Sequence, residues 1–134
     1  MRCALPAVGV AALLAGCGFD VSSPDLFLLT RSGQGRTLTL LVNDGGTIRC
    51  NGGRARRLAD PLLLRARDLA TNLDNDAKRK LRIPAPSGSV FRYTIRLQDG
   101  TISFPDTAAS SRSELAQTEL FAVQAAQQAC GLPG

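Results

Sequence analysis

Histidine is the side chain most often used as a general base or as a neutral metal ligand, and this chain contains none. A serine or cysteine nucleophile activated by imidazole therefore cannot form. Carboxylates remain, but Asp44 and Asp99 fall in predicted turns, and both glutamates, Glu114 and Glu119, fall in one predicted helix. No glycine-rich loop leads into a helix in the arrangement that binds phosphate groups. We therefore expect a non-catalytic protein that uses no metal and no cofactor.

Arginine is the chemically distinctive residue that remains, with fourteen arginines against two lysines. Its planar guanidinium group suits carboxylate and phosphate partners. Arg92 and Arg96 alternate with apolar residues in a predicted strand, which places them on its exposed face, and Arg49 points outward from an earlier strand. The densest basic run stands in a predicted loop and comprises Lys78, Arg79, Lys80 and Arg82. These residues are candidate anion contacts; the alternative is an ordinary solvated surface.

The overall composition is that of a globular protein, with 44% hydrophobic residues, 20% charged residues and a formal net charge of +5. Aromatic side chains are few: five Phe, one Tyr and no Trp. Proteins that bind single-stranded nucleic acid stack bases on aromatic rings, and this chain has few to offer. We therefore expect no nucleic-acid partner.

The elements that must position these residues follow from periodicity and turn residues. Alternation of apolar and polar residues predicts strands over 25–31, 37–42, 47–50, 90–98 and 101–104, with a loop over 51–58. Asp60 as the N-cap and Pro61 as the first helical residue predict a helix that ends near Leu73, with a buried stripe of Leu62, Ala66, Leu69 and Leu73. Ser111 to Glu114 matches a capping box and predicts a second helix reaching Cys130, with a stripe of Ala116, Leu120, Val123, Gln127 and Cys130.

The two halves of the chain resemble each other. A hairpin around Asn43–Gly46 and another around Asp99-Gly100 are each followed by a loop and an amphipathic helix. We therefore predict a single α+β domain over residues 25–134. It consists of two ββα units, giving an antiparallel sheet of four to five strands with two helices on one face. Residues 25–31 supply the extra strand.

The N-terminus resembles that of bacterial lipoproteins. Met1-Arg2 and the apolar run from Cys3 to Gly16 have the layout of a signal peptide, and the run is too short to span a bilayer. Leu14-Ala15-Gly16-Cys17 resembles a lipobox, the site at which lipoprotein precursors are cut before a cysteine that carries the lipid. The resemblance implies a signal peptide over 1–16, lipid on Cys17, and a tether over 17–24. An ordinary signal peptide or a buried helix is the alternative.

Cleavage would remove Cys3 and lipidation would occupy Cys17, so two free cysteines remain in the exported domain, Cys50 and Cys130. Two thiols in an oxidising space outside the cytoplasm favour a disulfide between them. Two separate buried thiols remain the alternative.

The mature domain resembles emfourins, small bacterial inhibitors of thermolysin-type metalloproteases. The resemblance rests on the order hairpin, helix, hairpin, helix over residues 37–128 and on the stretch Phe91 to Gly100 (FRYTIRLQDG). It implies protease inhibition as an alternative function, and no inhibitory residue is carried across. The main expectation is a non-catalytic binding or accessory domain, lipid-anchored at the extracytoplasmic face of the cell membrane. Its partners would be the membrane, through the lipid, and a protein or anionic component of the envelope.

Overall fold

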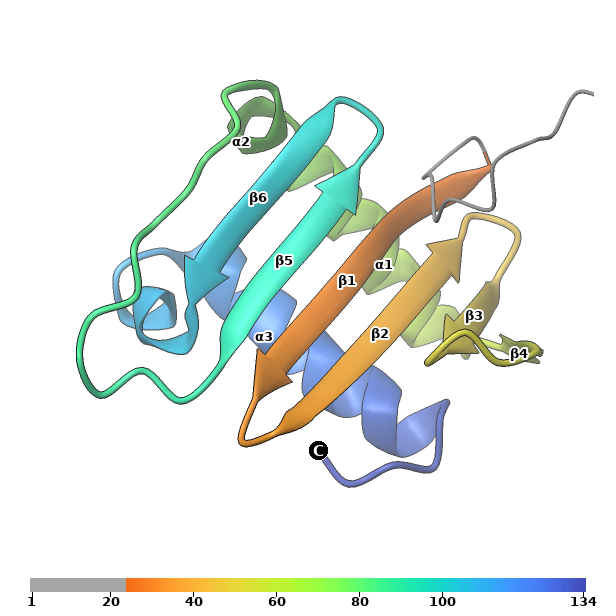
Figure 1. The fold of residues 1–134 in the computed structure, drawn as a ribbon. Coiled ribbons are helices and arrows are strands. Elements are labelled where there is room, and N and C mark those ends of the chain that lie inside the picture. The colour runs from red at the N-terminus through yellow and green to blue at the C-terminus, as the bar shows by residue number, and fades with distance from the viewer. Residues whose placement is uncertain (1–23) are drawn as a thin grey trace, which may run out of the picture.

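The computed structural model describes residues 24–134. The predicted signal peptide, the predicted lipid attachment at Cys17 and nearly all of the predicted tether lie outside these residues. Figure 1 shows the described elements in chain order. They are β1 (Asp25–Gly33), β2 (Arg36–Asn43), β3 (Thr47–Cys50), β4 (Ala55–Arg57), α1 (Asp60–Asn72), α2 (Asp74–Lys78), β5 (Arg92–Leu97), β6 (Gly100–Pro105), the 3₁₀ helix η1 (Asp106–Ser110) and α3 (Ser113–Gln128).

The strands form one antiparallel sheet in the order β4-β3-β2-β1-β5-β6. The predicted α+β class is confirmed, as are the two hairpin-plus-helix units, with α1 and α3 on the same side of the sheet (Figure 1). The predicted count of four to five strands is wrong, because the sheet has six. The missed strand is β4, whose residues are all exposed, so no apolar alternation marks it in the sequence.

The first strand joins the two units. β1 lies between β2 and β5 and pairs with both, so the strand predicted as an addition is central to the sheet. Its inward residues include Phe27 and Leu29, which are almost completely buried. The ring of Phe27 meets that of Phe121 in α3 edge to face, with 5.6 Å between centroids. This contact is part of the core between the sheet and the helices.

The first long helix follows the predicted pattern. α1 begins at Asp60, with Pro61 in its first turn and Leu62, Ala66 and Leu69 buried against the sheet. The residue at the cap position is Ala59, which offers no side-chain hydrogen bond, so Asp60 is the first helical residue and not the cap. Leu73 is fully buried after the end of α1.

The buried face of α3 differs from the predicted stripe. Its buried residues are Leu115, Thr118, Phe121, Ala122, Ala125 and Ala126, whereas Leu120 is 43% exposed and Gln127 is exposed. The prediction followed the larger apolar residues Leu120 and Val123, whereas the face of α3 that packs against the sheet is built mainly from small side chains. The capping box is also wrong: α3 has no side-chain cap, and the Ser111 hydroxyl donates to the carbonyl of Ala108.

The short helix α2 packs on the end of the β5–β6 hairpin. Gly100 begins β6 directly against it, and a Cβ atom at Gly100 would lie 2.0 Å from the carbonyl oxygen of Ala77. Only a residue without a side chain allows this approach. None of the helices in residues 24–134 combines the length and the apolar character that a membrane span requires.

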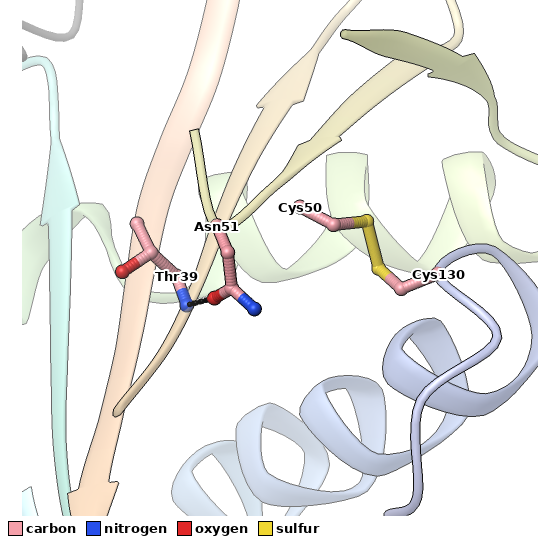
Figure 2. Close-up of a disulfide and its surroundings, with 4 residues drawn as sticks. All are labelled: Thr39, Cys50, Asn51 and Cys130. Atoms are coloured by element: carbon pink, nitrogen blue, oxygen red, sulfur yellow. Dashed lines mark hydrogen bonds between the residues drawn. A yellow bond between two sulfur atoms is a disulfide. The ribbon is translucent and has the colours of Figure 1, made fainter. Parts of the chain in front are cut away.

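A disulfide joins Cys50 and Cys130, as predicted (Figure 2). Their Cα atoms lie 5.9 Å apart, within the range that a disulfide spans. Cys50 ends β3, and Cys130 follows α3 by two residues. The bond therefore ties the β3–β4 edge of the sheet to the helical layer.

Candidate functional site

One face of the sheet is left uncovered by the helices, which lie on its other side (Figure 1). We call this surface the open face. Because side chains alternate along a strand, residues between the buried positions of each strand point to it. It comprises Leu28, Thr30, Ser32, Thr37, Thr39, Leu41, Thr47, Arg49, Arg57, Arg92, Thr94, Arg96, Thr101 and Ser103.

Strand register arranges these side chains in rows across the open face. Leu28 of β1 stands opposite Leu41 of β2 on one side and Arg96 of β5 on the other, and Leu41 stands opposite Arg49. This row has two half-buried leucines at its centre with an arginine on each side of them, and it continues to Thr101 beyond Arg96 and to Ala55 beyond Arg49. In a parallel row, Thr39, Thr30 and Thr94 stand next to one another. The open face is thus hydroxyl-rich, with half-buried leucines between arginines.

The charge on the open face is strongly basic. Arg49, Arg92 and Arg96 were predicted to point outward, and the structure brings them together on one surface with Arg57, which stands opposite Thr47 in the unpredicted β4. Along the six strands described, the one acidic residue is Asp25, at the start of β1, where it accepts a hydrogen bond from Asn43 at 3.1 Å. Arg57 could not be found from the sequence, since its face depends on β4.

A shallow hollow lies in the open face beside the end of β3. Its volume is about 410 Å³, and Leu28, Thr30 and Thr39 contribute to its floor. Asn51 also lines it and extends the β2–β3 ladder, because its N–H donates to the Thr39 carbonyl at 2.7 Å. Its side-chain oxygen accepts from the Thr39 N–H at 2.9 Å (Figure 2). The neighbouring disulfide at Cys50 holds this part of the hollow against the helical layer.

The basic run Lys78, Arg79, Lys80 and Arg82 begins at α2, which packs on the end of the β5–β6 hairpin. The prediction that it is a loop is wrong at its start, because Lys78 is the last residue of α2. Two of its members form ion pairs, Lys78 with Asp74 and Arg79 with Asp76. Lys78 contacts Asp74 at 2.8 Å, and this hydrogen bond raises the pKa of Lys78. The run continues beside the outer edge of β6, where residue 82 forms a bridge to Ser103. Because bridge partners point to the same side of a sheet, the exposed Arg82 extends the open face beyond Ser103, whereas Lys78 and Arg79 lie at the end of α2 and not in the row that contains Arg96.

Asp76 is the most buried acidic residue described, at 4% exposure. It accepts hydrogen bonds from Arg112 at 2.6 Å and Arg79 at 2.8 Å. Burial opposes its ionisation, but these two arginines outweigh burial and lower the pKa of Asp76. The carboxylate therefore ties α2 to the start of α3, which is a structural role.

A second perturbed carboxyl belongs to Glu119 of α3. Burial raises the pKa of Glu119 to about 7, and the charge of Asp106 adds to the effect. Its Oε1 atom is buried and lacks a hydrogen-bond partner among the residues described. Asp106 is itself committed to structure: burial raises its pKa, but hydrogen bonds from Ser89 and from the backbone of Val90, Phe91 and Thr107 prevail, so its pKa is lowered.

Metal-binding side chains do not gather in residues 24–134, where no group of three or more cysteine, aspartate or glutamate residues could hold an ion. The open face, where Arg49, Arg92 and Arg96 lie on one surface, is therefore the candidate site among the described residues. Comparison of the chain with protein families, curated proteins and solved structures finds no match.

Proposed function

We propose that this protein is a non-catalytic binding domain, held at the outer face of a bacterial cell membrane by a lipid on Cys17. Its open face receives a partner that carries carboxylate or phosphate groups. The observation that supports this proposal most is the row Arg49–Leu41–Leu28–Arg96, in which apolar area and guanidinium groups share one uncovered surface.

The physical basis is the chemistry of exposed arginine. A single exposed ion pair contributes about 0.2–1 kcal/mol, so one arginine would not hold a partner. Four arginines on one surface, with apolar contact between them, act together, and a basic residue near an anionic membrane surface contributes about 1 kcal/mol. A lipid anchor would add to this by keeping the domain beside its partner at high effective concentration.

The anchor is tested by intact-mass measurement of protein extracted from membranes. We expect a chain that begins at a diacylated Cys17, and we expect Cys17→Ala to release the protein from the membrane. A mature chain that begins elsewhere, or one whose membrane association is unchanged by Cys17→Ala, would contradict the anchor and leave the open face to be tested separately.

The partner is sought by capture from the cell envelope and from the culture supernatant, using residues 18–134 as bait. Bait carrying Arg92→Gln and Arg96→Gln should lose the partner. A matched control carries Arg65→Gln and Arg67→Gln, which remove the same charge from α1 on the helical side. If both double variants retain the partner equally, the open face is not the binding surface.

Inhibition of a secreted metalloprotease is the second candidate. It is favoured by the order β2–β3, α1, β5–β6, α3, on which the resemblance to emfourins rests. Recovery of a thermolysin-type protease in the capture experiment, with its activity blocked at a one-to-one ratio, would establish this function in place of the first.

A further inference from the structure

A separate cavity lies at the end of the sheet where the β1–β2 hairpin turns and β5 begins. Its volume is about 210 Å³. Arg31 and Arg36 line it with Thr37, Asn51, Phe91 and Leu132. It shares Thr37 and Asn51 with the shallow hollow of the open face. Its other lining residues include Arg31 and Leu38, whose side chains point to the helical side of the sheet.

Arg31 is the residue of this cavity whose position and charge favour an anionic ligand. It lies two positions beyond Leu29 in β1, so it points to the helical side of the sheet, and it is partly buried. Its guanidinium carbon lies 5.0 Å from the centre of the Phe91 ring, and the group also approaches the Tyr93 hydroxyl. Within residues 24–134 neither Arg31 nor Arg36 forms an ion pair.

The Phe91 ring and the Tyr93 hydroxyl replace part of the hydration that Arg31 loses, but no side-chain carboxylate of residues 24–134 neutralises its charge. Glu119 is the nearby acidic residue of α3, and its charge affects Tyr93, yet it does not pair with Arg31. The guanidinium of Arg31 is therefore positioned by an aromatic ring and a hydroxyl at the wall of a cavity, and among the described residues no side-chain carboxylate pairs with it.

The cavity is also preformed around this group. A Cβ atom at Gly33 would lie 2.7 Å from Phe91 Cδ1, so the glycine lets the ring pack against the hairpin below Arg31. Leu38, Leu132 and Pro133 supply apolar wall, and Asn51 supplies an amide. A ligand that fits has one anionic end for the arginines and a short apolar body for this wall.

We infer that this cavity binds a small aliphatic monocarboxylate, with the carboxylate on Arg31 and Arg36 and the hydrocarbon chain against Leu38, Leu132 and Pro133. The planar fork of arginine pairs with a carboxylate through two parallel hydrogen bonds. The site is independent of the proposed function of the open face, and either can fail without the other.

The test is a titration of the full chain, in neutral detergent with its disulfide intact, with 4-methylpentanoate and with the neutral amide of the same acid. The chain has one tyrosine and no tryptophan, so its ultraviolet emission reports on Tyr93 beside Arg31. We expect the acid to change this emission saturably and to shift the amide resonances of Phe91 and Asn51, and the amide compound to do neither. Arg31→Gln should weaken binding by about tenfold or more, because a charged hydrogen-bonded contact is lost.

Arg65→Gln, which removes an arginine of α1 that contacts Gln124 of α3 and does not line the cavity, is the control and should bind as the unsubstituted chain does. If Arg31→Gln disturbs the fold, as its melting curve would show, Arg36→Gln removes the exposed second arginine instead and should still weaken binding. Equal binding of acid and amide, an absence of saturable binding, or unaltered binding by both arginine variants would overturn the inference.

Discussion

The disulfide permits a quantitative prediction about stability. Cys50 and Cys130 are separated by 80 positions, so the bond closes most of the domain into a loop. The chain-entropy relation for a loop of this length gives about 4.5 kcal/mol at 25 °C. That is comparable with the whole free energy of unfolding of many small domains. At the entropy of unfolding usual for a domain of this size, its loss lowers Tm by about 15–20 °C.

The assay compares thermal and urea unfolding of the oxidised chain, the reduced chain and the variant with both Cys50→Ala and Cys130→Ala. Reduction isolates the cross-link, whereas the double variant also removes packing, since Cys130 is buried. We expect the reduced chain to lose most of the predicted free energy, and the double variant to lose slightly more.

Hydrogen exchange shows how the loss is distributed. The Asn51 N–H, bonded to the Thr39 carbonyl beside Cys50, should exchange at the rate of global unfolding in the oxidised chain. A reduced chain that loses less than about 1 kcal/mol and shows faster exchange only near Asn51 would refute the reasoning. The bond would then stabilise the β3–β4 edge locally and would not act by restricting the unfolded chain.

Three further predictions concern single side chains. Asp76→Asn should cost about 3 kcal/mol in urea unfolding, because it removes the charge of a buried carboxylate that accepts hydrogen bonds from two arginines. Arg79→Gln should cost less than about 1 kcal/mol, because the Arg79 side chain is 73% exposed, and equal costs would contradict this. Glu119 has a pKa raised to about 7 on folding, so the folded state binds more protons than the unfolded state between about pH 4.5 and 7, and stability should fall as pH rises through that window. Glu119→Gln should flatten the profile, and an unchanged slope would disprove the assignment. Gly100→Ala should lower Tm by several degrees, because its Cβ would overlap the Ala77 carbonyl, and a neutral effect would contradict that close approach.

Strands with clear alternation could be predicted from the sequence. Leu38, Leu40 and Val42 in β2, like Tyr93, Ile95 and Leu97 in β5, are buried as expected. The buried face of α3 could not be predicted, because Ala122, Ala125 and Ala126 carry a weak hydrophobic signal beside the exposed Leu120. β4 could not be predicted either, since pairing with β3, and not its own side chains, makes Ala55–Arg57 a strand.

The candidate site shows the same limit. The outward placement of Arg92 and Arg96 follows from period-two alternation, which is a local property. Their neighbours do not follow from it, because Leu28 meets Arg96 only when β1 inserts between the two hairpins. Asp76 likewise meets Arg112 across 36 positions of sequence, a distance over which local patterns carry no information.

The central claim is that the arginines of the open face carry binding to an anionic envelope partner. The most direct measurement is the binding of residues 18–134 to isolated cell envelopes as a function of salt, compared with the Arg92→Gln/Arg96→Gln and Arg65→Gln/Arg67→Gln variants. The account predicts binding that weakens as salt rises, and an affinity about 30-fold lower for the first variant only, from about 1 kcal/mol for each arginine. Equal affinity of the two variants, or binding that salt does not weaken, would contradict it.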